Sequence, residues 1–167
     1  MMHSTLLEEV LVFTPGCFRD FRGDLWTLWN REDSPLDLDF NHDKVSVSKR
    51  NVLRGLHTDS KSWKLITCLH GEVQLVVVDY RKDSKNYLKS EYLILNNENK
   101  ISVLIPPMFL NGHLVLSDSA VFHYKWSYKG EYPDVEDQLS VHYDCLDIPW
   151  LEKNVLLSAR DSAASRL

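Results

Sequence analysis

The chain has 167 residues, of which 44% are hydrophobic and 26% charged, a composition typical of one soluble globular domain with a real core. Its formal net charge of −5 excludes the broad basic surface of nucleic-acid-binding proteins, so we expect no nucleic-acid partner. An anionic ligand would need a local basic pocket, for which the candidates are Arg22, Lys44, Arg54 and Lys64.

Cysteine spacing and hydropathy bear on the compartment. Cys17, Cys68 and Cys145 lie far apart without paired spacing, which favours reduced thiols over a disulfide scaffold. Residues 1–13 lack the basic start and long apolar run of a signal peptide. No stretch has the apolar length that a membrane span requires. We therefore expect a cytoplasmic protein that does not enter a membrane.

The first third of the chain reads as short strands separated by turns. Residues 6–13 predict a strand that ends at Thr14-Pro15-Gly16. Residues 19–23 read as a turn and residues 25–29 as the next strand. A polar loop follows, and residues 44–48 alternate strictly, which predicts a strand with one wet face.

The rest of the chain continues this pattern. Five further β-rich runs are bounded by Gly, Pro, Asn or charged residues, and they span residues 71–79, 87–95, 101–105, 114–116 and 120–126. Many short strands with turns between them favour an all-β sandwich or barrel. Only the tail after Trp150 offers short helical segments. We see no repeat and no linker, so residues 1–167 are expected to form a single domain.

The stretch of most chemical interest is Val52-Leu53-Arg54-Gly55-Leu56-His57, followed one loop later by Lys64. A guanidinium and an imidazole this close could bind an anion and move a proton near neutral pH. Strict alternation would place Leu53 and Gly55 on one face and Arg54 and Leu56 on the other, although Gly55 can bend the strand. The plain alternative is a strand-end histidine that is hydrogen-bonded to the backbone.

Several common motifs are missing from the sequence. It contains no Gly-rich phosphate loop, no CxxC pair and no HExxH. Metal-binding cupin barrels usually have two histidines one residue apart with a carboxylate soon after, a spacing that no histidine adopts here. We therefore expect no metal and no other cofactor, although His57, His70, His113, His123 and His142 could still converge in space.

An ordered series of motifs resembles the RmlC-like nucleotide-sugar 3,5-epimerases, whose type member is dTDP-4-dehydrorhamnose 3,5-epimerase. The series is NVLRGLH, then Lys64, GEVQLVVVDYRKDS, VLIPPMFLNGH, HYKWSYKGEY and HYDCLDIPW. It covers the chain from about Phe13 to Trp150. The resemblance implies a cupin-type jelly roll, usually a homodimer, that uses no metal. It also implies 3- and/or 5-epimerisation of a nucleotide-linked 4-keto sugar for cell-surface polysaccharides.

The resemblance assigns catalytic roles to four residues. His57 matches the catalytic base and Tyr124 the proton donor. Asp144, in HYDCLDIPW, matches the carboxylate that orients the base. Lys64 matches the lysine that faces the keto oxygen. Three residues match substrate contacts, namely Arg54 at the pyrophosphate, Tyr132 stacked on the base, and Arg22 at the nucleotide.

The chemistry of a 4-keto sugar explains these residue types. The keto group acidifies the C–H bonds at C3 and C5, so a base with an ordinary pKa near neutrality can form an enolate. A carboxylate would fix the imidazole tautomer, as it does in a catalytic triad. A lysine would stabilise the charge on the keto oxygen. A tyrosine on the opposite face would return a proton and invert the centre.

Four substrate-binding positions depart from the usual family pattern. Asn111 replaces a histidine, because MFLNGH stands where the family has GFAHGF. Thr27 replaces a glutamate, and His42 and Lys44 replace two neutral amides. The loop between Tyr124 and Tyr132 is two residues longer than in the dTDP enzymes. These changes resemble the branch acting on GDP-linked 4-keto-heptoses, so GDP is predicted to bind better than dTDP.

Each assignment has a plainer alternative when taken alone. Asp144 could close a turn, Tyr124 could be a core tyrosine, and Lys64 could be solvated. For the whole protein, the alternative is a non-catalytic or metal-dependent sugar-nucleotide-binding cupin, because jelly rolls host many functions. The joint occurrence of the motifs in family order favours an epimerase.

Overall fold

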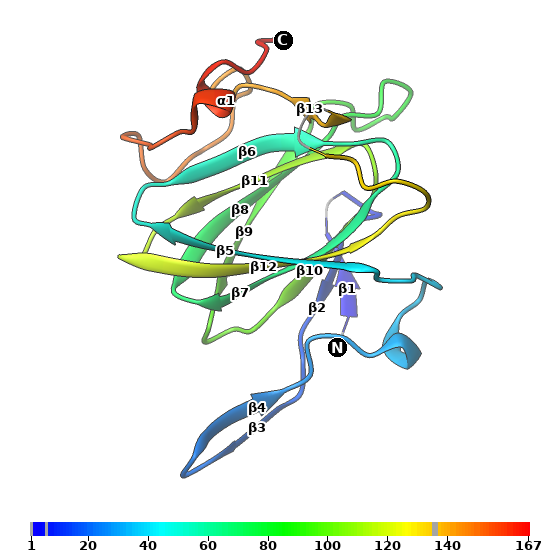
Figure 1. Ribbon diagram of the computed structural model, residues 1–167, viewed down its shortest axis with the longest axis vertical. Coiled ribbons are helices and arrows are strands. Elements are labelled where there is room, and N and C mark those ends of the chain that lie inside the picture. Colours follow the sequence, from blue (N-terminus) through cyan, green and yellow to red (C-terminus); the bar gives the residue numbers. More distant parts are fainter. Residues whose placement is uncertain (1, 6, 135–136) are drawn as a thin grey trace.

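The structure is a computed structural model that describes residues 2–5, 7–134 and 137–167 (Figure 1). Those residues form antiparallel strands with one short α-helix and one 3-10 turn. The elements are β1 (Met2–Ser4), β2 (Leu11–Phe13), β3 (Cys17–Asp20), β4 (Gly23–Trp26), η1 (Arg31–Asp33), β5 (His42–Lys49), β6 (Leu53–Thr58), β7 (Trp63–His70), β8 (Glu72–Asp79), β9 (Ser90–Asn96), β10 (Ser102–Ile105), β11 (Phe109–Val115), β12 (Ser119–Ser127), β13 (Leu139–Ser140) and α1 (Ala159–Ser162).

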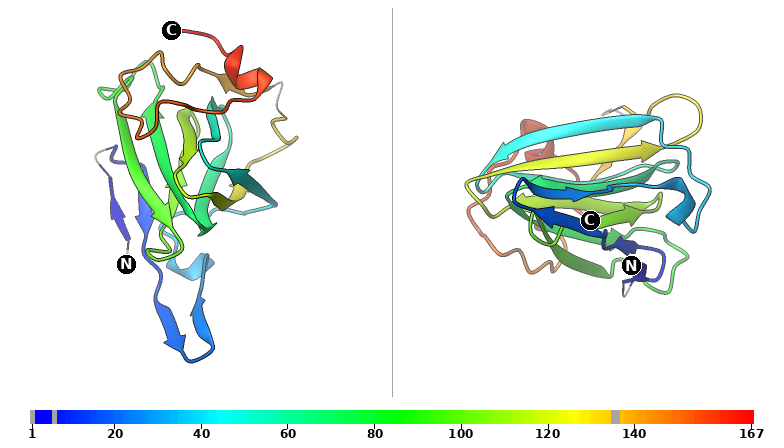
Figure 2. Two further views of the ribbon diagram at one scale, coloured as in Figure 1. Left: turned by 90° about the vertical axis from the view of Figure 1, so that its left-hand side faces the viewer. Right: turned by 90° about the horizontal axis from the view of Figure 1, so that it is seen from below.

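Two sheets face each other and make the body of the molecule (Figures 1 and 2). The larger sheet has the order β1-β2-β10-β7-β12-β5, and the smaller has the order β13-β6-β11-β8-β9. Neighbours in each order are antiparallel and many are distant in sequence, as in a jelly roll. The prediction of an all-β jelly roll with a short C-terminal helical segment is confirmed.

Strand β8 explains why the smaller sheet is buried on both faces. Val73, Leu75 and Val77 point into the core between the sheets. Val76 and Val78 point the other way, into a second apolar cluster with Val141 and Ile148 from the C-terminal segment. A continuous β-branched run suits this position because neither face meets water. The C-terminal segment is thus packed against the sheet that carries β6.

The observed strands correct the expected boundaries in the N-terminal region. The predicted strand over 6–13 is shortened to β2, because Thr5 and Leu7 form a turn in which the Thr5 Oγ1 accepts from the Leu7 backbone. Residue 6 lies outside the described residues. A further strand, β1, was not predicted, and it pairs with β2 at the edge of the larger sheet. No helix of the described ranges is long and apolar enough to cross a membrane.

Strands β3 and β4 form a hairpin that projects from the body (Figures 1 and 2). Its base is held by Lys100, whose Nζ lies 2.8 Å from a carboxylate oxygen of Asp24 and 5.3 Å from the ring centroid of Trp26. Its tip carries Phe21, which is 99% exposed, and Arg22. The hairpin therefore presents an apolar ring and a cation away from its own sandwich.

Candidate active site

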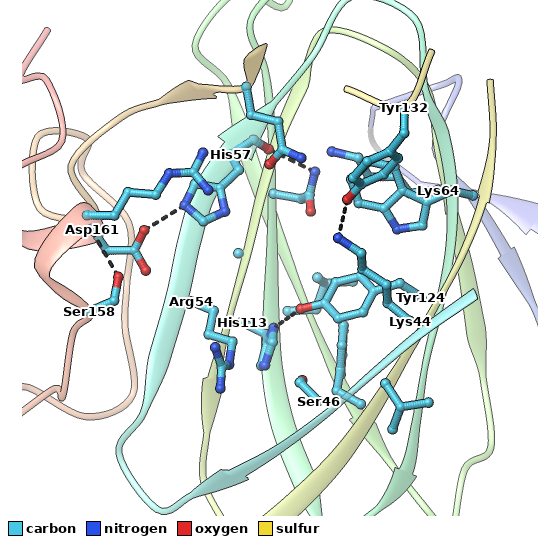
Figure 3. A pocket seen from close by; sticks show the side chains of 18 residues that line it. Lys44, Ser46, Arg54, His57, Lys64, His113, Tyr124, Tyr132, Ser158 and Asp161 are labelled. Atoms are coloured by element: carbon cyan, nitrogen blue, oxygen red, sulfur yellow. Dashed lines mark hydrogen bonds and ion pairs between the residues drawn. The ribbon is translucent and has the colours of Figure 1, made fainter. Parts of the chain in front are cut away.

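A cavity of about 290 Å³ opens between the two sheets, and side chains from both sheets line it (Figure 3). Strands β5, β7 and β12 contribute from the larger sheet, and β6, β8 and β11 from the smaller. The segment 158–161 closes one side. Of the predicted residues, the cavity brings together Lys44, Arg54, His57, Lys64, Asn111, Tyr124 and Tyr132.

A bulge in β6 places Arg54 and His57 on the same face. His57 is paired with Asn111 of β11 and Arg54 with His113, so three residue steps on β6 match two on β11. Gly55 sits in the bulge with φ of 131°, and a Cβ there would lie 2.5 Å from the Cα of Gly112. Only glycine fits this backbone, and the extra residue turns both side chains into the cavity.

His57 is held by Asp161, a residue that the sequence analysis missed. Its Nε2 lies 2.6 Å from Oδ1 of Asp161, which sits in α1 (Figure 3). Ser158 caps this helix, because its Oγ accepts from the Asp161 backbone N–H. Burial by itself would raise the pKa of Asp161, but the contact with His57 and further hydrogen bonds from Ser158 and the Gly55 backbone lower it below its usual range. Asp161 is therefore a carboxylate that can orient and charge-balance the imidazole.

Asp144 does not lie at His57, so the prediction that it orients the base is wrong. It binds Nδ1 of His142 at 2.5 Å and the guanidinium of Arg166 at 2.9 Å, and it does not line the cavity. Hydrogen bonds, mainly from Arg166 and then from His142, lower the pKa of Asp144, although burial opposes them. Its role here is to hold the C-terminal residues beside His142.

Tyr124 reaches the cavity from β12, on the sheet opposite His57. Its hydroxyl points toward His113 of β11, and Oη lies 3.4 Å from Nδ1 of that ring (Figure 3). Burial raises the pKa of Tyr124 above its usual range, although Arg54 opposes this. Tyr124 therefore stays protonated at neutral pH, as a proton donor must.

Lys64 is buried on β7 between a carboxylate and an aromatic ring. Its Nζ lies 3.4 Å from Oδ2 of Asp59 and 4.7 Å from the ring centroid of Trp126. Burial lowers the pKa of Lys64, while the charge of Asp59 raises it. Because Lys64 lines the cavity and is not solvated, the plain alternative of a surface lysine is excluded.

An aromatic group stands at the β5 end of the cavity. The ring of Tyr132 lies 4.3 Å from that of His42, centroid to centroid, and 5.3 Å from that of Trp126. Lys44 hydrogen-bonds the Tyr132 hydroxyl, and its Nζ lies 4.3 Å from the ring centroid (Figure 3). The ring of His42 packs against Tyr132 but does not itself line the cavity. Such a platform suits a flat heterocyclic base.

Asn111 lines the cavity beside His57. Its Nδ2 donates to the backbone carbonyls of His57, at 3.0 Å, and of Phe109, at 3.2 Å. This side chain therefore fastens β11 to the strand that carries His57. Its amide oxygen remains as an acceptor for a ligand.

Besides His42, two predicted substrate contacts, Arg22 and Thr27, lie outside the cavity. Arg22 is at the exposed tip of the β3–β4 hairpin, where its guanidinium binds Asp20 at 2.6 Å. Thr27 is exposed just after β4. Within one chain neither residue meets the other candidates, because the hairpin points away from the sandwich.

The cavity also contains residues that the sequence analysis did not single out for it. They include the polar residues Ser46, His113, Gln138, Ser158, Arg160 and Asp161. The missed signal for Asp161 is the run Leu157-Ser158-Ala159-Arg160-Asp161, which has the S-x-x-D pattern of a helix start. Nothing in the sequence around Ser46 or Gln138 indicates a functional role, because each is an ordinary polar residue in or beside a strand.

No cluster of His, Cys, Asp or Glu in the described part of the chain could hold a metal ion. The candidate ligands are instead engaged in pairs, such as His57 with Asp161 and His123 with Asp43 at 2.7 Å. What the cavity offers is acid–base chemistry. An imidazole with a carboxylate behind it lies on one sheet, a phenol on the other, and cations between them.

A family model described as dTDP-4-dehydrorhamnose 3,5-epimerase matches residues 4–167. The dTDP-4-dehydrorhamnose 3,5-epimerase of Shigella flexneri is 36% identical over 165 residues, covering 94% of this chain and 90% of that protein. The crystal structure of dTDP-6-deoxy-D-glucose-3,5-epimerase from Legionella pneumophila, in complex with dTDP-4-keto-L-rhamnose, has a TM-score of 0.90 and 34% identity. The match covers 98% of this chain and 92% of that one. ChmJ, a 3'-monoepimerase from Streptomyces bikiniensis in complex with dTDP-quinovose, has a TM-score of 0.88 and 27% identity, with 97% and 85% covered.

Proposed function

Because the chain belongs to the dTDP-4-dehydrorhamnose 3,5-epimerase family, we propose that it is an isomerase that epimerises a nucleotide-linked 4-keto-6-deoxy sugar. The reaction inverts C3, C5 or both, next to the keto group, and supplies a sugar for cell-surface polysaccharide. The observation that carries the proposal is that His57 of β6, paired with Asp161 of α1, faces Tyr124 on the opposite sheet. Residues 1–167 act as one domain in this proposal.

The proposed mechanism uses the two sheets as the two faces of the sugar. His57 takes the proton from the carbon next to the ketone, and Asp161 balances the imidazolium that forms. Tyr124 then donates its hydroxyl proton to the same carbon from the opposite side, which inverts the centre. Because the proton leaves toward one sheet and returns from the other, inversion of the carbon is favoured over retention of its configuration.

A buried cation, Lys64, and an exposed one, Arg54, complete the site. Lys64 is placed to stabilise the enolate oxygen, since its ammonium faces the cavity in a dry environment. Arg54 donates through Nε to Ser48 at 3.1 Å, which leaves the remaining guanidinium donors for a diphosphate oxygen. No cofactor is required, because the ketone itself acidifies the reacting C–H bond.

The nucleotide base has two candidates. The relatives above are named for dTDP-linked sugars, which supports a dTDP-4-keto-6-deoxyhexose. GDP-4-keto-6-deoxyheptose is the second candidate, and the observation in its favour is Lys44 at the Tyr132 platform. An ammonium donor there suits the O6 and N7 acceptors of guanine.

We also propose a homodimer in the cytoplasm. The projecting hairpin exposes Phe18, Phe21 and Leu25, an apolar group that a second copy would cover. A second copy could also receive Arg22 and Thr27 at its own cavity, which would explain why these two lie apart from the site in one chain. The cysteines Cys17, Cys68 and Cys145 are all free, which suits a reducing compartment.

A non-catalytic sugar-nucleotide-binding cupin is the alternative function. It is less well supported, because binding alone needs neither a paired His–Asp nor a phenol on the opposite wall. A metal-dependent cupin is disfavoured because His57, His123 and His142 are each paired with an aspartate.

The deciding experiment is deuterium incorporation from D₂O into dTDP- and GDP-linked 4-keto-6-deoxy sugars, located by NMR. We expect the wild type to label C3, C5 or both and to yield the epimer. His57→Ala should lower labelling by about 10²–10⁴-fold. The matched control is His70→Ala, at the exposed end of β7. Labelling by His57→Ala at the control rate would refute the assigned base, and an unlabelled wild type would refute the epimerase.

A further inference from the structure

One buried titratable residue of the cavity has no role in the mechanism above. His113 lies in β11 and is 2% exposed. Its ring stacks on Phe122 with a centroid distance of 4.0 Å and an interplanar angle of 15°. The family motif has phenylalanine at this position, so a ring would satisfy the packing without any nitrogen. An imidazole here calls for a separate explanation.

The two ring nitrogens of His113 have different surroundings. Nδ1 lies 3.4 Å from the hydroxyl oxygen of Tyr124 (Figure 3). Nε2 is buried and has no hydrogen-bond partner among the described residues. In the described part of the chain, the ring therefore has one hydrogen-bond partner, the phenol that acts as the proposed acid.

The ring is neutral at physiological pH. Burial, helped by the neighbouring side chains of Arg54 and His57 on β6, lowers the pKa of His113 to about 3. A neutral imidazole carries one N–H, on one nitrogen or the other. Placing it on Nε2 would bury an unpaired donor, whereas placing it on Nδ1 leaves only an unpaired acceptor, which proteins tolerate better.

We propose that His113 is a positioning residue for Tyr124, donating from Nδ1–H to the phenol oxygen. This inference rests on the proposed function. The donated bond occupies an Oη lone pair, so the hydroxyl hydrogen of Tyr124 is directed into the cavity. When the Tyr124 O–H bond breaks and the new C–H bond forms, the same N–H stabilises the phenolate. The contact of 3.4 Å should then shorten, as charge-assisted hydrogen bonds do.

Three substitutions separate this role from packing. His113→Phe keeps a flat ring on Phe122 but removes both nitrogens. His113→Asn keeps a donor near the position of Nδ1, and His113→Gln moves the donor to the position of Nε2. The proposal requires that asparagine rescues function and that phenylalanine and glutamine do not.

The readout is the split between two rates measured in D₂O with dTDP- and GDP-4-keto-6-deoxy sugars. Labelling by His57 precedes the step of Tyr124, so His113→Phe should slow formation of the epimer about 10-fold or more while labelling changes little. His113→Asn should recover most of the epimer, and His113→Gln should not. Equal loss of both rates in His113→Phe, or equal behaviour of Asn and Gln, overturns the proposal.

A second measurement tests the tautomer without turnover. In protein with ¹⁵N-labelled histidine, the His113 signals, assigned by their loss in His113→Asn, should show a neutral ring protonated at Nδ1. Tyr124→Phe should shift them. An Nε2-protonated ring overturns the inference. If the wild type makes no epimer from either sugar while the ring is Nδ1-protonated, the proposed function fails and the hydrogen-bond assignment stands.

Discussion

Nε2 of His57 lies 2.6 Å from Oδ1 of Asp161, whereas Asp144 is bound to His142 and Arg166 outside the cavity. We therefore expect Asp161→Asn to lower deuterium incorporation by about 10²–10⁴-fold, because an amide cannot fix the reactive tautomer or balance the imidazolium. Asp144→Asn is the matched control and should retain near wild-type labelling. A loss in Asp144→Asn as large as in Asp161→Asn would return the orienting role to Asp144.

Tyr124→Phe should separate the two half-reactions. Removal of a proton by His57 does not need the phenol, so labelling from D₂O should persist. Formation of the inverted product should fall by about 10²–10⁴-fold, since the acid on the far side is lost. The measurement is the ratio of label to epimer in one NMR time course. Parallel loss of both would assign Tyr124 to binding or packing.

The buried neutral imidazole of His113 should make stability depend on pH. Its pKa is about 3 in the folded chain and about 6.5 in the unfolded chain. Between these values only the unfolded state binds the proton, so the free energy of unfolding falls as pH falls from about 6.5 toward 3. Lowering the pH from 7.5 to 5.0 should cost the wild type about 2 kcal/mol more than it costs His113→Phe. Urea titrations of both proteins at the two pH values measure this, and identical pH dependence would contradict it.

Local pattern was enough to predict most strands. The continuous apolar run of β8 indicated a buried strand, and the structure has an apolar cluster on each of its faces. Alternation failed at Gly55, because a bulge reverses the facing of His57 relative to Arg54. Sequence spacing does not show where a strand carries such an extra residue. That Arg54 and His57 share a face could therefore be seen only from the strand pairing in the structure.

The carboxylate behind His57 was misassigned because its sequence distance carries no information on proximity. Asp161 lies 104 positions from His57, and only the packing of the C-terminal segment on β6 brings them together. Asp144 stood in a more recognisable segment, yet its carboxylate turns to Arg166. Arg22 and Thr27 lie outside the cavity of their own chain, so their predicted role depends on the proposed second copy.

The hairpin β3–β4 leads to a prediction about assembly. We expect a homodimer by light scattering at micromolar concentration, because Phe21 at the tip is left without cover in one chain. Arg22→Ala should weaken nucleotide-diphosphate binding without changing the fold, since Arg22 would reach the cavity of the second copy. Arg31→Ala, an exposed arginine paired with Asp37, is the control. A monomer, or equal affinity in the two variants, would contradict the shared site.

The last prediction concerns the base, and it follows from the side chains at the Tyr132 platform. Lys44 and His42 lie two residues apart on one face of β5 and both contact Tyr132. Two positions that carry neutral amides in the usual family pattern thus present an ammonium and an imidazole.

We predict that GDP binds more tightly than dTDP, CDP or UDP in calorimetric titrations under one buffer, because guanine offers two acceptors to Lys44. Lys44→Asn should reduce the affinity for GDP by about 5–100-fold and that for dTDP less, on the scale of a specific base contact. Lys125→Asn is the control, since Lys125 faces outward on the neighbouring strand, 3.0 Å from Asp43. Tighter binding of dTDP than of GDP in the wild type would contradict the prediction and place the base preference with the dTDP-named relatives.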